Sequence, residues 1–191
     1  MSSIKLTADS GGGTFEIKAP SSSGNTRVLT LPDTHNLTLN GGVILQVKQT
    51  FKQDTQSITS GSSSYTLING LGTTMTLSNA SNKILINLSI SFAQSANNYA
   101  AFRLYDGSSE ITAAQSTGAG VYNTSIIRYV DTEMANSYLG CSFSYLYAPG
   151  DTNAHTINLY GNPFNTTLYI NRSNNTNYYN TSSMTLMEVA A

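Results

Sequence analysis

The residues that could perform catalysis or hold a metal are few. His35 and His155 are the only histidines of the chain; we expect the first in a linker and the second at the start of a strand. A zinc site needs several ligands at suitable spacing, and a catalytic triad needs a base beside a nucleophile. The sequence has neither pattern. We therefore expect both histidines to be exposed or simply hydrogen-bonded, with no metal and no cofactor.

Carboxylates are the second group that could do chemistry. A glycoside hydrolase needs two of them facing one bond, and Asp106, Glu110, Asp131 and Glu133 are the candidates. Asp106, however, lies in the turn-like text YDGSS, where aspartate is favoured for conformational reasons. The run Gly11–Gly13 is not a phosphate loop, because no Lys-Ser/Thr pair closes it and no helix follows. The sequence favours a protein that is not an enzyme.

The segment from Tyr160 to Tyr179 mixes tyrosines and an arginine with Asn, Ser and Thr. Rigid aromatic rings beside adaptable amides are typical of recognition loops. Buried or interface tyrosines with satisfied hydroxyls would explain the same text, so both interpretations stay open. If the loops contact a host, the candidate residues are Tyr169, Asn171, Arg172, Tyr178 and Tyr179.

Charge is scarce along the whole chain. Only 10% of the 191 residues are charged and the formal net charge is -1, which argues against binding to nucleic acid through phosphate contacts. So little charge gives weak protection against association and suggests an oligomer. The single Cys141 excludes a disulfide framework and is expected in the core. The N-terminal text has no apolar signal-peptide region, and no apolar run is long enough to span a bilayer.

The elements that must position these residues are strands. Residues 83–92, KILINLSISF, alternate between apolar and polar over the whole stretch, with Ile84, Ile86, Leu88, Ile90 and Phe92 on one side. This period of two predicts a half-buried strand. Residues 139–147 alternate in the same way and are expected to pair with or face the first strand.

Other short alternating segments follow at intervals, separated by Gly-, Asn- and Asp-rich turns. We expect them at 43–51, 65–67, 73–77, 100–105, 111–114, 125–130, 155–160, 167–170 and 183–189. The last should place Met184, Leu186 and Val189 toward the core. Residues 131–138 offer only a weak helical alternative. The pattern predicts an all-β protein, an antiparallel sandwich or jelly roll.

The N-terminal part has a different sequence pattern. Three brief apolar pairs or triplets, at Ile4/Leu6, Phe15/Ile17 and 28–31, are separated by Gly and Ser clusters. So small a β unit is marginal alone and is expected to fold against a partner. We place the boundary near residue 40, with a short N-terminal segment and linker over 1–40 and a sandwich domain over 41–191.

Both ends of the chain resemble tail-fibre-like virion proteins of tailed phages, including phages of marine cyanobacteria. At the start, a Gly-rich turn (Gly11, Gly12, Gly13), an IKAP strand (17–20) and an R-x-L-T-L-P-D motif (27–33) carry the resemblance. At the end, a Y-x-N-R loop (169–172) precedes a last strand of the type S-x-x-x-x-M-E (182–188). The middle matches only by strand pattern, and no long fibrous shaft follows the first motif.

The resemblance implies a structural protein of the virion, assembled in the bacterial host cytoplasm. It implies a homotrimeric jelly roll of the tumour-necrosis-factor and complement type, and an N-terminal segment that attaches to another virion protein. The implied attachment residues are Gly11, Gly12, Gly13, Phe15, Ile17, Arg27, Leu29 and Leu31. A short tail fibre contacting a host surface glycan or protein is the leading expectation. A trimeric capsid decoration protein and a free carbohydrate-binding module are the alternatives, and no nucleic acid or membrane partner is expected.

Overall fold

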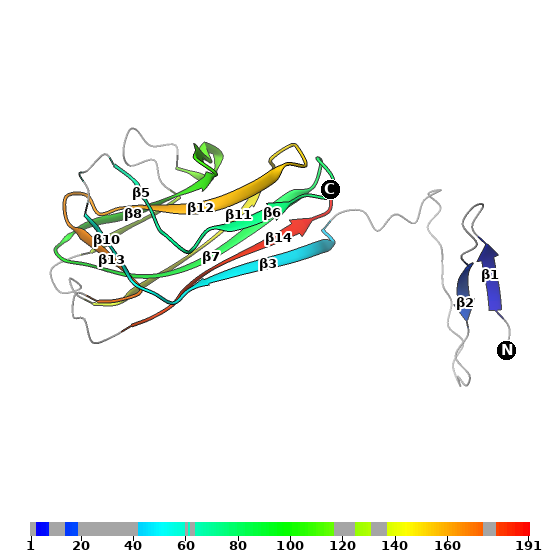
Figure 1. Cartoon of the computed structure of the whole chain (residues 1–191), viewed down its shortest axis with the longest axis horizontal. Helices are drawn as coiled ribbons and strands as arrows, with labels where there is room; N and C mark the ends of the chain where they lie inside the picture. Colours follow the sequence, from blue (N-terminus) through cyan, green and yellow to red (C-terminus); the bar gives the residue numbers. More distant parts are fainter. Residues whose placement is uncertain are drawn as a thin grey trace. The chain divides into compact units, whose positions relative to one another are not determined.

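The computed structural model describes residues 3–7, 14–18, 42–59, 61, 64–116, 125–130, 137–173 and 179–191 (Figure 1). The chain divides into two compact units, Met1–Thr38 and Leu39–Ala191. In the shorter unit, β1 (Ser3–Thr7) pairs antiparallel with β2 (Thr14–Lys18). The third expected segment of this unit, 28–31, lies outside the described residues.

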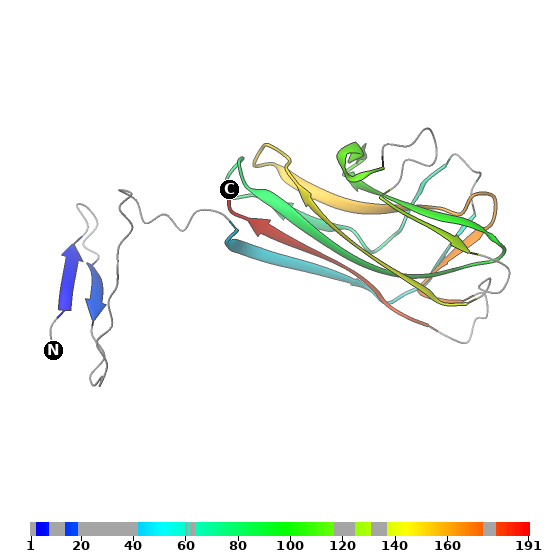
Figure 2. The ribbon, with the colours of Figure 1, turned by 180° about the vertical axis from the view of Figure 1, so that it is seen from behind.

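The larger unit is a sandwich of two antiparallel sheets (Figures 1 and 2). In the first sheet, β7 pairs with β11 along one edge and with β14 and β13 along the other; β3 pairs with β14, and β4 with β13. The strands of this sheet are β3 (Ile44–Lys52), β4 (Gln56–Thr59), β7 (Lys83–Gln94), β11 (Leu139–Tyr147), β13 (Thr167–Ile170) and β14 (Ser182–Val189).

The second sheet is built around β8 and β12, which pair with each other. β10 and β9 pair with the free edge of β8, and β5 and β6 pair with β12. Its strands are β5 (Thr66–Leu67), β6 (Thr73–Thr76), β8 (Asn98–Asp106), β9 (Ser109–Glu110), β10 (Ile126–Val130) and β12 (Ala154–Asn162). The chain passes repeatedly from one sheet to the other, as in a jelly roll, which confirms the predicted fold class.

The core lies between the sheets, and β7 supplies its central row. Ile84, Ile86, Leu88, Ile90 and Phe92 are all buried, so the predicted alternation is confirmed. β11 pairs with β7 in register from Leu139 opposite Phe92 to Tyr147 opposite Ile84. Cys141, opposite Ile90 in this register, is partly buried and packs against the core.

Two predicted elements differ from the structure. Residues 111–114 were expected to be a strand, but Thr112–Ala114 form a 3-10 turn. Within this turn the Ala114 N–H bonds to the Ile111 carbonyl at 3.0 Å. One turn brings both apolar side chains to the core at three-residue spacing, where Ile111 is 5% and Ala114 7% exposed. In addition, β4 is a strand that was not predicted; its Ile58 is buried and lies opposite Leu168 of β13.

The inward side chains of the C-terminal strand, β14, are apolar as far as Leu186, and the next one is charged. Met184 and Leu186 are fully buried, but the next inward position is Glu188, which is 1% exposed. Val189, the predicted core residue, follows a β-bulge and is only partly buried. In the described part of the chain no helix is long and apolar enough to cross a membrane. The weak helical alternative at 131–138 lies mostly outside the described residues.

Candidate functional site

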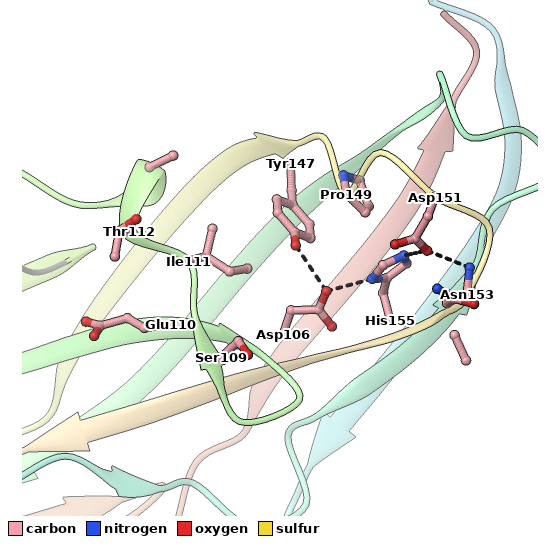
Figure 3. A pocket seen from close by; sticks show the side chains of 12 residues that line it. Asp106, Ser109, Glu110, Ile111, Thr112, Tyr147, Pro149, Asp151, Asn153 and His155 are labelled. Atoms are coloured by element: carbon pink, nitrogen blue, oxygen red, sulfur yellow. Dashed lines mark hydrogen bonds and ion pairs between the residues drawn. The ribbon is translucent and has the colours of Figure 1, made fainter.

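A pocket of about 480 Å³ opens between the ends of β8, β11 and β12 (Figure 3). Asp106 ends β8, Tyr147 ends β11 and His155 lies at the start of β12. His155 Nδ1 lies 2.6 Å from Asp106 Oδ2, and its Nε2 lies 3.1 Å from Asp151 Oδ1. The Tyr147 hydroxyl donates to the same Asp106 oxygen at 3.0 Å. We call these four residues the His155 cluster.

The electrostatics of the His155 cluster keep Tyr147 protonated. Burial, and then its hydrogen bond to the negatively charged Asp106, raise the pKa of Tyr147 to about 12. The pKa of Asp151 is lowered, first by the hydrogen bond from the Asn153 backbone N–H and then by His155. An imidazolium can donate from both ring nitrogens. Each ring nitrogen of His155 lies within hydrogen-bond distance of a carboxylate oxygen, so the ring bridges Asp106 and Asp151.

The His155 cluster links the ends of β8, β11 and β12 through hydrogen bonds. Asp106 uses one oxygen for two donors, and Glu110, also in the pocket, lies 2.7 Å from Arg103 Nη1 and accepts from Gln115. These carboxylates are held by neighbours instead of facing each other as an acid and a nucleophile would. Among the described residues, no group of three or more His, Cys, Asp or Glu could hold a metal ion. His35, Asp131 and Glu133 lie outside the described residues.

Sequence reasoning did not connect Asp106 with His155. The two residues are 49 positions apart, and only the register of β8 against β12, in which Ile157 lies opposite Asp106, brings them together. His155 is buried and hydrogen-bonded, one of the two expected states. A histidine at a strand start with an Asp four residues before it was the available signal.

The predicted host-contact residues differ in their exposure in the structure. Asn171 is fully buried; its amide nitrogen donates to the carbonyls of Lys52 and Asp54, and its oxygen accepts from Ser182. It orders the chain and does not present its amide at the surface. Arg172 lies 4.2 Å from the ring centroid of Tyr169 and donates to Ser57. Tyr179 pairs with Arg172 through an isolated antiparallel β-bridge of the backbone, and it is 67% exposed.

Several predicted positions fall outside what is described. Tyr178 is one of them. The others are attachment residues: Gly11, Gly12, Gly13, Arg27, Leu29 and Leu31. Phe15 and Ile17 belong to β2, where the backbone register sets them opposite Leu6 and Ile4 of β1.

The outer face of the first sheet, the side turned away from the core, carries an apolar row. Cross-strand register aligns Val47 of β3, Met187 of β14, Leu85 of β7 and Leu146 of β11. Val47 is 56% and Leu146 45% exposed. We call these four residues the apolar row.

β3 has an inverted polarity that extends this surface. Its outward positions Ile44 and Phe51 are 50% and 59% exposed. Its inward positions are polar: Gln46, Lys48, Thr50 and Lys52. Exposed apolar patches of this kind mark interaction surfaces.

No protein-family model and no curated protein matches the chain. Among solved structures, a chain from the Gx strain of infectious bursal disease virus is 12% identical with a TM-score of 0.38, over 93% of this chain and 46% of that one. A chain from the Gt strain is 10% identical with a TM-score of 0.28, over 92% of this chain and 39% of that one. The chain thus spans less than half of either viral chain, and both likenesses are too weak to carry a function to it.

Proposed function

We infer that the chain is a structural protein of a phage virion, a short homotrimeric tail fibre. Its N-terminal segment attaches to another virion protein and its jelly roll faces the host surface. The motif at 27–33 and the Y-x-N-R loop at 169–172 support the virion context through their resemblance to tail-fibre-like proteins. The small size of the β1–β2 pair supports attachment, because two short strands alone are marginal in water.

The observation that carries self-association is the outer face of the first sheet. The apolar row crosses four of the six strands there, and Lys83 is the one charged residue among the outward positions of these four strands, β3, β7, β11 and β14. Three copies of this face can converge on a threefold axis, where Lys83 is the one outward charge that each copy contributes from these strands. They would remove exposed apolar side chains from water, the main driving force of association. Copies of one chain related by closed symmetry are the simplest partners for this face.

Light scattering on the purified full-length chain over a range of concentrations tests this proposal. The expected mass is that of three chains. Val47→Glu places a charge in the apolar row and should shift the mass toward that of one chain. Thr74→Glu is the matched control, because Thr74 is an exposed strand residue of the second sheet and its substitution should leave the mass unchanged. A wild-type chain that stays monomeric at every concentration would contradict the proposal.

A further inference from the structure

A second pocket, of about 500 Å³, lies on the outer face of the first sheet, toward the opposite end of β7 from Leu85 of the apolar row. β7 and β11 contribute Ser89, Ser91 and Gly140 to its lining. Tyr138, just before β11, and Asn180 and Thr181, just before β14, complete it together with Ile90 and Leu139. We call it the Ser91 pocket.

Ser91 is the unusual residue of this pocket. It alternates with the buried Ile90 and Phe92, so its side chain belongs to the outer side of the sheet. Ser91 is 6% exposed, and within the described structure its hydroxyl oxygen has no hydrogen-bond partner. A buried hydroxyl without a protein partner is rare in folded proteins and calls for a specific explanation.

Gly140 provides the space beside Ser91. It lies directly opposite Ser91 in the β7–β11 register. A Cβ atom built on Gly140 would meet no heavy atom within 4 Å. The sheet therefore leaves open volume over Gly140, directly beside Ser91, whose hydroxyl oxygen is itself buried.

The chemistry of the lining points to one class of ligand. None of the lining residues is charged, so the pocket offers no ionic partner to a phosphate, a carboxylate or an amine. It offers hydroxyls, an amide at Asn180 and the ring of Tyr138, which is 37% exposed. Hydroxyl and amide groups bond to other hydroxyls, and an aromatic ring covers an apolar face. The volume lies within the range of about 300–1,000 Å³ typical of small-molecule sites.

We propose that the Ser91 pocket binds an uncharged saccharide. The Ser91 hydroxyl gains its missing partner from a sugar hydroxyl, and Tyr138 packs against the carbon face of the ring. The backbone N–H of Asn180 donates to the carbonyl of Asn171 at 2.8 Å, so the pocket adjoins the Y-x-N-R loop. The inference rests on the proposed function only for the source of the sugar, the host surface.

The experiment is a titration of the full-length protein with a panel of sugars, followed by calorimetry and saturation-transfer NMR. The uncharged probes are glucose, galactose, mannose, N-acetylglucosamine and their disaccharides; glucuronate and glucosamine are the charged counterparts. We expect saturable binding of at least one uncharged sugar and weaker binding of its charged counterpart. Gly140→Val, which fills the open volume, should weaken that binding at least tenfold.

Two further variants separate binding from folding. Ser91→Ala removes a hydroxyl that has no partner in the described protein, so the melting temperature should hold or rise while sugar affinity falls. Ser144→Val, on the same strand and face as Gly140 but outside the pocket, should leave affinity unchanged. Binding of none of the uncharged sugars, a preference for the charged ones, or full affinity in Gly140→Val would each overturn the inference.

Light scattering on the same samples distinguishes this inference from the proposed function. A trimer that binds no sugar would overturn the saccharide site alone. A monomer that binds sugar would overturn the trimeric fibre alone.

Discussion

The side-chain amide of Asn82 donates a 2.7 Å hydrogen bond to the carboxylate of Glu188 across 106 residues of sequence. The same carboxylate oxygen accepts from the backbone N–H and the hydroxyl of Ser78, and the other oxygen accepts from Gln46. Neutral donors from β3 and from the β6–β7 connection thus hold a buried negative charge on the last strand. The C-terminus is fixed nearby, where Asn82 accepts from the Ala191 N–H.

Glu188→Gln should destabilise the domain at neutral pH. The glutamine side chain would turn an NH₂ group toward donors that in the wild type meet a carboxylate oxygen. The free energy of unfolding should therefore fall by about 2 kcal/mol. Burial works to raise the pKa of Glu188, but the hydrogen bonds from Asn82, Ser78 and Gln46 outweigh it and lower the pKa to about 2. Urea unfolding followed by circular dichroism at fixed protein concentration measures the difference.

The pH dependence of that difference follows from the lowered pKa. A carboxyl whose pKa is lower in the folded state stabilises the protein above its unfolded pKa. Glu188 should therefore contribute fully above about pH 5, and the contribution should fade as the pH drops toward 2. The gap between wild type and Glu188→Gln should narrow over this range. A gap that stays constant from pH 7 to pH 3 would refute the assignment.

Asp106→Asn should lower the pKa of Tyr147. Burial is the first cause of the raised value of about 12 and the charge and hydrogen bond of Asp106 are the next, so the neutral amide should bring the pKa part of the way back toward 10. NMR titration of tyrosine rings labelled at Cζ reports this change, with Tyr147→Phe identifying the signal. Asp54→Asn, a change outside the pocket, is the control. An unchanged pKa of Tyr147 in Asp106→Asn would contradict the role of Asp106.

How far the sequence predicts this molecule depends on whether a feature is local. The alternation in 83–92 determines both the strand and its buried side, and the structure agrees at each predicted core position: Ile84, Ile86, Leu88, Ile90 and Phe92. β3 is different, because its apolar residues face outward and its core side carries only polar residues; among its polar residues only Gln49 faces outward. Alternation alone does not tell which side of a strand meets the core, so the apolar row was not foreseen.

The sites depend on register, which the sequence does not display. His155 meets Asp106 only because β12 pairs with β8 at one particular offset. Glu188 is buried because Ser78, Asn82 and Gln46 converge on it, and no hydrophobicity pattern contains that information. Asn171 resembled a recognition residue because of its neighbours in sequence, but its partners lie on β3, beyond β3 and on β14.

Two substitutions of Asn171 should distinguish the stability contributed by its hydrogen bonds from the strain of its backbone conformation. Its φ of 57° lies in the left-handed region, which glycine adopts freely and alanine does not. Asn171→Gly loses the hydrogen bonds to Lys52, Asp54 and Ser182 and should cost about 2–3 kcal/mol. Asn171→Ala loses the same bonds and adds strain, about 1 kcal/mol more. Equal unfolding free energies for the two variants would show that φ is not constrained here.

Two strand glycines provide the last test, because they share a residue type and differ in surroundings. A Cβ on Gly161 would lie 2.8 Å from Leu168 Cδ2 and 3.6 Å from both Ile68 Cδ1 and Phe102 Cε1. Gly161→Ala should therefore overpack the core and cost about 1–3 kcal/mol. A Cβ on Gly140 meets nothing within 4 Å, so Gly140→Ala should be neutral or stabilise by about 0.5–1 kcal/mol through lower chain entropy.

The contrast between the two glycines bears directly on the Ser91 pocket. Thermal unfolding of both alanine variants and the wild type, at one protein concentration, measures it. If Gly140→Ala is as damaging as Gly161→Ala, the volume beside Ser91 is filled in the folded protein, and Gly140→Val could not act as a clean block of sugar binding. If Gly140→Ala is tolerated and Gly161→Ala is not, the space over Gly140 is open while the space between the sheets is closed. That is the arrangement a surface binding site on a well-packed jelly roll requires.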